Sequence, residues 1–144
     1  MRVLVTVVPG VLALALPSVD AWAAARGQET VPKKKVVIAT RSFTGAAAQA
    51  DRWGEVQVTI VVRKTTTTIG TKKTVTRRIR SATVPTYPNH TDRSVFINQQ
   101  ALPYLVQETL QAQSSAIHMV SGATDTSYAF QSSLQSAILH ARAW

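Results

Sequence analysis

Residues 121–127, which read Ser-Gly-Ala-Thr-Asp-Thr-Ser, directly precede an amphipathic helical pattern near the C-terminus. The start of a helix offers free backbone amides and the positive end of the helix dipole, and together these bind phosphate. Gly122 and Ala123 let the backbone approach a ligand closely because their side chains are absent or small. The hydroxyls of Ser121 and Thr124 can bond phosphate oxygens. The segment therefore predicts a phosphate site.

Ordinary helix capping is the alternative interpretation of the same residues. Thr124 or Asp125 would then accept a hydrogen bond from an amide of the first turn, as these residue types commonly do. If the segment binds phosphate, we expect Asp125 to face solvent, because its carboxylate would repel the ligand.

The chain offers few other groups for chemistry. His90, His118 and His140 lie far apart and lack the spacing of metal ligands. His118 could pair with a phosphate if protonated, while a neutral loop histidine is the alternative. The absence of cysteine excludes disulfides, thiolate metal sites and a lipoprotein anchor. No nucleophile elbow, Walker loop or dinucleotide-binding glycine motif occurs, so neither hydrolysis nor nucleoside triphosphate chemistry is indicated.

Strand patterns occupy the first half of the expected domain. Residues 54–62 alternate between apolar and polar side chains, which predicts a half-buried strand. Residues 63–80 are rich in threonine and favour an exposed hairpin that turns at Gly70, with Val75 and Ile79 on its inner side. Residues 82–87 continue as a strand.

From Ser94 onward the apolar spacing becomes helical, and Pro103 must lie in a first turn or mark a kink. A last helix is expected to begin near Asp125 or Thr126. Its apolar stripe comprises Phe130, Leu134, Ala137, Ile138 and Ala141. Strands followed by helices predict an α+β fold: an antiparallel sheet followed by two C-terminal helices, in a single small domain.

The N-terminus resembles a targeting segment. Residues 1–25 combine a basic start at Arg2, an apolar run and the small-x-small pattern Ala21-Trp22-Ala23, which predicts a signal peptide. A short uncleaved anchor is the alternative, and either segment places the domain outside the cytoplasm, secreted or membrane-associated. Residues 26–40 are expected to form a polar, basic linker, and residues 41–144 the domain.

The formal net charge of +9 favours contact with anionic partners. The hairpin at residues 63–80 carries much of this charge and no acidic residue. It lacks the interleaved aromatic residues that stack on nucleic-acid bases, and a secreted protein has no gene-regulatory role, so no nucleic-acid partner is expected. A solvated basic edge that discourages aggregation is the alternative to a binding surface.

Ser-Gly-Ala-Thr-x-Thr resembles the signature of the FMN-binding domain family. That family includes the flavin-carrying C subunit of the sodium-pumping NADH:quinone oxidoreductase and the G subunit of the Rnf complex. The similarity extends over residues 41–140, from Phe43-Thr44-Gly45 to the last helix, and is strongest over residues 113–127. It resembles the short, secreted, actinobacterial type of member.

The resemblance implies that FMN is the cofactor and that a flavin transferase esterifies its phosphate to Thr126. It places Ser121, Gly122, Ala123 and Thr124 at the phosphate, and His118 beside them.

Two positions depart from the family. An acidic residue usually stands three positions before the motif serine, where this chain has His118, and the hairpin at residues 63–80 replaces a shorter turn. If the transferase reads that carboxylate, FMN binds without a covalent bond, so covalent and non-covalent attachment both stay open.

Two functions follow from these patterns. The first is an extracytoplasmic flavin carrier, more a redox relay than a stand-alone enzyme, that passes electrons between membrane and extracellular partners. Its flavin ring could be flanked by aromatic residues, although core packing is the alternative for each: Trp53, Tyr87, Tyr104 and Tyr128. The second is a cofactor-free basic module that binds a cell wall or a membrane surface.

Overall fold

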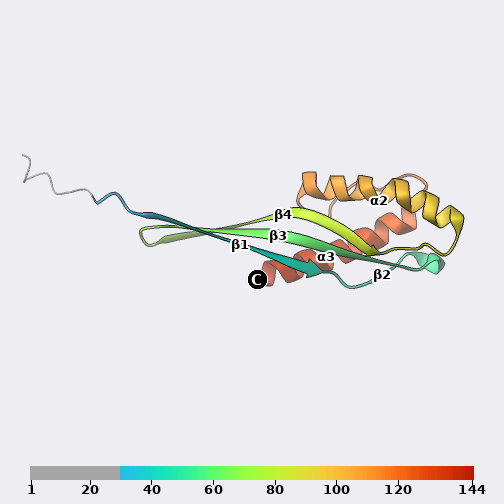
Figure 1. Ribbon diagram of the computed structural model, residues 1–144, viewed down its shortest axis with the longest axis horizontal. Coiled ribbons are helices and arrows are strands. Elements are labelled where there is room, and N and C mark those ends of the chain that lie inside the picture. Colours follow the sequence, from blue (N-terminus) through green and yellow to red (C-terminus); the bar gives the residue numbers. More distant parts are fainter. Residues whose placement is uncertain (1–29) are drawn as a thin grey trace, which may run out of the picture. The chain divides into compact units, whose positions relative to one another are not determined.

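The protein is described by a computed structural model of residues 30–144, in which Lys33–Trp144 forms one compact unit. The predicted signal segment, residues 1–25, lies outside the described residues. The elements follow in the order β1 (Lys34–Thr44), β2 (Ala48–Gln49), the 3-10 turn η1 (Asp51–Trp53), β3 (Glu55–Ile69), β4 (Lys72–Thr86), α2 (Asp92–Ala112) and α3 (Thr124–Ala143) (Figure 1). This is the predicted α+β fold, with an antiparallel sheet followed by two C-terminal helices.

β3 is the central strand of the sheet, and all of its partners are antiparallel to it. β4 pairs along one edge, from Gln57 to Ile69 of β3. β1 and the short β2 share the other edge. The predicted turn is confirmed, because Gly70, with φ of +60°, and Thr71 join β3 to β4. Glycine adopts such a positive φ without steric cost.

The core forms where α3 packs on β3. Val56, Val58, Ile60 and Val62 alternate along β3 and are buried, as the period-2 pattern predicts for one face of a half-covered strand. The predicted apolar stripe of α3 is also confirmed. Its buried members are Phe130, Leu134, Ala137, Ile138 and Ala141. α2 adds Ala101, Leu102 and Leu105 to the buried set.

Two features of α2 place it beside the sheet. Thr91 caps its N-terminus by accepting a hydrogen bond from the Ser94 amide at 3.1 Å. Gln113 ends the helix with φ of 54°, and its side-chain amide bonds both the N–H and the C=O of Ile79 on β4. Pro103 lies well inside the helix, so of the two predicted alternatives the first turn is wrong and the kink stays a prediction.

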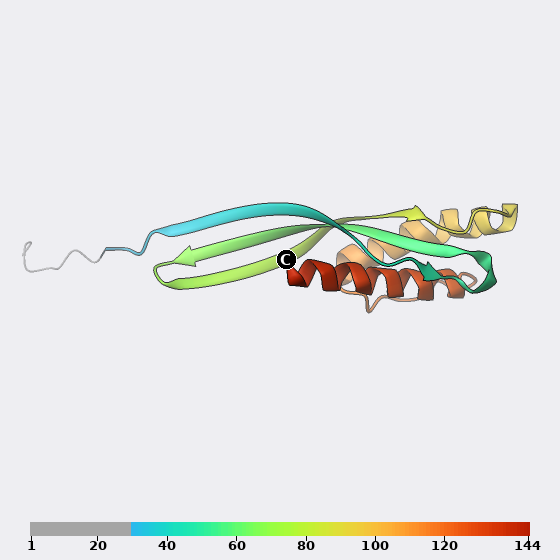
Figure 2. The same ribbon diagram turned by 90° about the horizontal axis from the view of Figure 1, so that it is seen from below.

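The sheet continues past the helices, where β1, β3 and β4 run on as three strands without a helical cover (Figure 2). Residues 34–40, assigned to the linker by the sequence, belong to β1. The run Val36-Val37-Ile38 has strong β propensity and pairs with the threonine-rich part of β3. Ile79 is buried as predicted, but Val75 is 38% exposed because it lies beyond the helices.

Within residues 30–144, no helix is both long enough and apolar enough to cross a membrane.

Candidate functional site

The predicted phosphate segment forms a turn that leads into α3. Gly122 has φ of +82°, a value that favours glycine, and the Ala123 amide donates to the Val120 carbonyl at 3.0 Å. Ser127 fixes this turn from inside. Its Oγ donates to the Ala123 carbonyl at 2.8 Å and accepts from the Val120 amide at 3.1 Å. The turn is therefore held by its own helix.

α3 begins at Thr124, close to the predicted start, and Ala123 is its N-cap. No side chain caps this helix, so the interpretation of Thr124 or Asp125 as an ordinary cap is wrong. The first amides of a helix have no partner within the helix. The amides of Thr124, Asp125 and Thr126 are consequently available to a ligand, and Asp125 itself is exposed, as expected.

Thr126 lies in the first turn of α3 and is only 8% exposed. Its Oγ1 donates a hydrogen bond to Asn98 Oδ1 on α2 at 3.0 Å. The Asn98 amide is itself oriented, because its Nδ2 donates to the Pro88 carbonyl at 2.8 Å. The hydroxyl proton of Thr126 is thus directed at Asn98.

A hollow of about 100 Å³ lies at this helix start. Residues 122–126 form one wall, and the first two turns of α2 form another with Arg93, Ser94 and Asn98. Trp53 of η1 also lines the hollow. The first turns of both helices line this hollow, so two positive dipole ends act on the same space, and Arg93 is among the lining residues.

A second, larger groove of about 320 Å³ lies beside the first. Both are bordered by Ile97, Gly122 and Ala123. The larger groove is also lined by Phe96 and Tyr104, which are 63% and 48% exposed. It thus presents two aromatic side chains that the core does not use.

The structure separates the four aromatic residues considered for the flavin ring. Trp53 lines the smaller hollow and Tyr104 lines the larger groove. Tyr87 packs partly buried against the core. Tyr128 is exposed and borders neither hollow.

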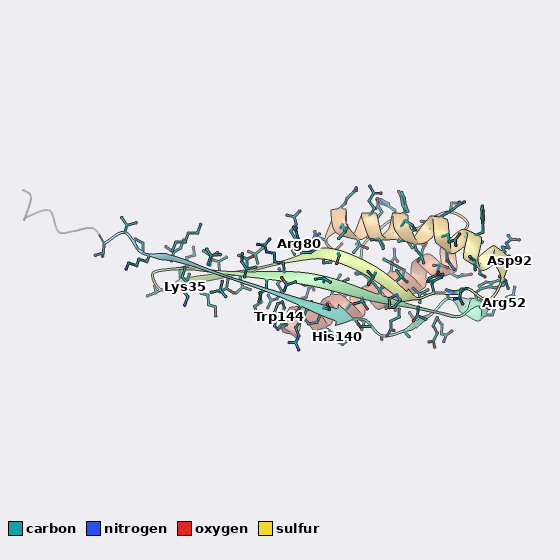
Figure 3. The ribbon with its side chains drawn as sticks, in the orientation of Figure 1. Lys35, Arg52, Arg80, Asp92, His140 and Trp144 are labelled. Carbon is teal, nitrogen blue, oxygen red and sulfur yellow. The ribbon has the colours of Figure 1, made fainter. Side chains whose placement is uncertain are left out.

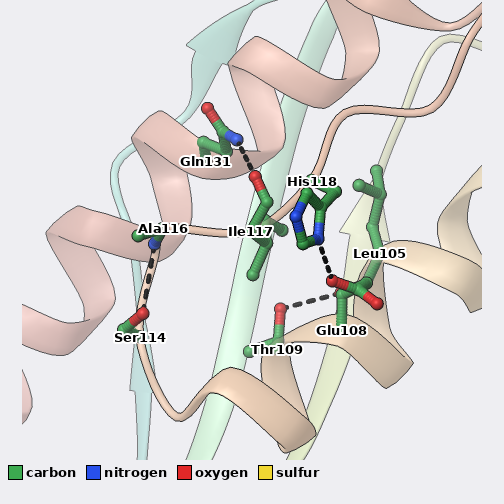
Figure 4. Close-up of polar contacts among 8 residues, drawn as sticks. All are labelled: Leu105, Glu108, Thr109, Ser114, Ala116, Ile117, His118 and Gln131. Carbon is green, nitrogen blue, oxygen red and sulfur yellow. Dashed lines mark hydrogen bonds and ion pairs between the residues drawn. The ribbon is translucent and has the colours of Figure 1, made fainter.

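His118 stands apart from the other predicted site residues. Its side chain is 87% exposed, borders neither hollow, and places Nδ1 2.9 Å from Glu108 Oε2 of α2 (Figure 4). The loop that carries it is anchored where Gln131 Nε2 donates to the Ile117 carbonyl at 2.7 Å. A carboxylate therefore does stand beside position 118, but it comes from α2.

Of the other predicted site residues, Gly122, Ala123, Thr124 and Thr126 border the smaller hollow, while Ser121 borders only the larger groove. Arg93 and Asn98 were not identified as site residues from the sequence. The only local signal is the cap at Thr91, which marks the start of α2. It does not indicate that Asn98 of this helix will contact Thr126, 28 positions further along the chain. Among residues 30–144, no group of three or more His, Cys, Asp or Glu side chains is placed to hold a metal ion.

Substitutions of Gly122 test whether its left-handed backbone conformation, rather than the space around it, requires glycine. A Cβ at this position would meet no atom within 4 Å, but valine disfavours φ of +82°. We expect Gly122→Val to lower the free energy of unfolding by about 1–2 kcal/mol, and Gly122→Asn, which tolerates this conformation, to lower it much less. Urea denaturation measures both. Equal stability of wild type and Gly122→Val would show that residue 122 does not hold this left-handed conformation.

No protein-family model matches this chain, and a search of curated proteins finds no match to its sequence.

Proposed function

We propose that Lys33–Trp144 binds FMN with its phosphate at the N-terminus of α3, and that the protein is an extracytoplasmic electron carrier. One observation carries the proposal. The uncapped start of α3 borders a hollow that is also lined by Arg93 of α2 and by Thr126.

The donors at this hollow suit a phosphate. The amides of residues 124–126 point from the helix start, and the hydroxyls of Thr124 and Thr126 lie within the same turn. Arg93 supplies a positive charge from α2 and offsets the exposed carboxylate of Asp125. Backbone amides and a guanidinium are the groups that commonly hold phosphate oxygens.

The sizes of the two hollows support a ligand with two ends. The hollow of about 100 Å³ is the smaller of the two and lies at the helix start, where a phosphate group would bind. The groove of about 320 Å³ reaches the lower range of small-molecule pockets and offers Phe96 and Tyr104 as flat apolar surfaces. Gly122 and Ala123 line both, so the two hollows adjoin, and the proposal places the phosphate in the smaller and the ring in the larger.

The flavin would supply the redox chemistry, while this chain binds and orients it. The larger groove is bordered by half-exposed side chains, so a ring held there would stay accessible to a partner protein. Such access suits electron exchange with a membrane or extracellular redox partner better than catalysis in a closed pocket. Covalent attachment through Thr126 would require a flavin transferase and would remove the hydroxyl proton now directed at Asn98.

The proposal is tested with the full chain produced with and without a flavin transferase. We expect protein made with the transferase to be yellow, and protein made without it to bind added FMN but not riboflavin, which lacks the phosphate. Fluorescence quenching of the free flavin measures the difference. Colourless protein that ignores FMN, or equal binding of riboflavin, would contradict the proposal and favour the cofactor-free surface-binding function.

A further inference from the structure

The uncovered part of the sheet carries charge of one sign. This part, which we call the ribbon, consists of residues 34–40 of β1, 63–69 of β3 and 72–78 of β4. It contains no acidic residue. Its basic residues are Lys34, Lys35, Arg63, Lys64, Lys72, Lys73, Arg77 and Arg78. Within residues 30–144 the one salt bridge joins His118 to Glu108, so no Asp or Glu side chain of this part of the chain forms a salt bridge with the ribbon.

Strand register sorts these side chains onto two faces. Directly paired residues share a face, and successive residues alternate. The face that continues from buried Val62 and Ile79 lies on the helix side. The other, which we call the open face, is defined by four paired rows: Thr40–Arg63–Arg78, Ile38–Thr65–Thr76, Val36–Thr67–Thr74 and Lys34–Ile69–Lys72.

The helix side is partly used by the protein itself. Lys64 Nζ lies 4.8 Å from the centre of the Trp144 ring and donates to the Trp144 carbonyl. Figure 3 shows Trp144 near the end of α3 and Lys35 far out on the ribbon. A flat partner that approached the helix side would meet the end of α3, whereas α3 does not lie over the open face.

The open face combines cations with exposed apolar side chains. Four cations lie in its two end rows, Arg63 and Arg78 in the row nearest the helices and Lys34 and Lys72 in the row beside the hairpin turn. Among them lie Val36, Ile38 and Ile69, which are 47%, 51% and 44% exposed. Threonines fill the remaining positions.

We propose that the open face of the ribbon docks on an anionic lipid membrane. Cations draw a protein to anionic headgroups, and apolar side chains between them enter the boundary between headgroups and acyl chains. A polyanionic polymer would use the cations but gain little from Val36, Ile38 and Ile69. Single-stranded nucleic acid would need aromatic side chains for stacking, and the open face has none. Docking here is independent of the proposed flavin site.

Two double variants of β4 test the orientation. Lys72→Gln/Arg78→Gln removes two cations from the open face, and Lys73→Gln/Arg77→Gln removes two from the helix side of the same strand. All four side chains are exposed, and each variant relieves one like-charge pair across the strands, Arg63–Arg78 or Lys64–Arg77. The variants are therefore matched in net charge and in local strain, and circular dichroism confirms that both fold.

Co-sedimentation with vesicles of phosphatidylcholine and phosphatidylserine measures the partition coefficient. Each cation near an anionic surface contributes a factor of about five, so the open-face variant should bind roughly 30-fold more weakly at low salt. The helix-side variant should lose at most about fivefold. All variants keep the same N-terminal segment, and binding to vesicles of phosphatidylcholine alone is subtracted.

A second pair tests the apolar contribution. Ile38→Thr/Ile69→Thr should lose the binding that persists above 0.15 M salt, where the Debye length is about 8 Å, whereas Val37→Thr/Val75→Thr should keep it. Equal losses in the two charge variants would show that net charge alone acts and would overturn the proposal. Equal losses in the two apolar variants would show that the apolar side chains of the open face make no specific contribution, and would overturn it as well. Wild-type protein that binds heparin but not the anionic vesicles would assign the ribbon to a polymer and overturn it as well.

Discussion

Gly45→Ala is expected to lower the free energy of unfolding by about 3 kcal/mol or more, the upper range for overpacking a filled site. A Cβ on Gly45 would lie 1.9 Å from the carbonyl oxygen of Ser133 in α3, and that oxygen belongs to the helix backbone. Relief would require α3 to move away from the sheet. Urea denaturation and thermal melting would measure the change, with a fall in melting temperature of roughly 10 °C or more.

Movement of α3 would also break the polar contacts that surround this approach. The Gly45 amide donates to the Val58 carbonyl at 2.8 Å, and Ser133 Oγ accepts from the Val58 amide at 2.9 Å. Ala46→Ser is the control, because Ala46 is exposed and adjacent in the chain. A Gly45→Ala protein within about 0.5 kcal/mol of wild type would show that α3 does not pack as closely as described.

The part of the fold that follows from local patterns was predictable. Alternation along residues 54–62 identifies the central strand and its buried face, and the helical spacing of Phe130, Leu134 and Ile138 identifies the face of α3 that meets it. The close approach at Gly45 was not predictable. The run of small residues around Gly45 does not indicate that the backbone of Ser133, 88 positions further along the chain, will pack against it.

The predicted boundary between linker and domain at residue 40 was wrong, and the error has a physical cause. Lys33-Lys34-Lys35 reads as a solvated tether, since charge runs rarely lie in a covered strand. In this structure no helix covers residues 34–40 of β1, so the lysine side chains remain in solvent. Pairing with β3, rather than burial, orders these residues. The alternation of side chains along the strand put Val75 on the same face as Ile79, which is correct, but Val75 is exposed rather than buried.

The candidate site divides in the same way. Residues 121–127 were recognised because consecutive small and hydroxylated residues before a helix are a local pattern, and the structure places them at a turn and a helix start. Arg93 and Asn98 reach the same hollow only because α2 packs beside α3. The lack of a cap on α3 could not be foreseen either, since Thr124 and Asp125 are both common capping residues.

Thr126→Val is expected to abolish covalent attachment of FMN while retaining the fold. Valine keeps the shape of threonine but lacks the Oγ1 that the phosphoester requires. Thr126→Ser keeps a hydroxyl in reach of Asn98 and should retain attachment. The matched control is Thr124→Ala, which removes the exposed hydroxyl from the same hollow and should leave attachment intact. Intact mass under denaturing conditions detects the gain of one FMN less one water.

The hydrogen bond to Asn98 predicts a stability cost that accompanies the loss of flavin. Thr126→Val leaves Asn98 Oδ1, on a side chain that is 2% exposed, without its donor. This unsatisfied oxygen should lower the free energy of unfolding by about 1–3 kcal/mol, and Thr126→Ser should restore most of it. A mass gain that persists in Thr126→Val, or that maps to Thr124, would contradict Thr126 as the attachment site. If wild type and Thr126→Val are equally yellow when native and both lose flavin on denaturation, the hollow binds FMN without a covalent bond, because the amides and Arg93 remain in both proteins.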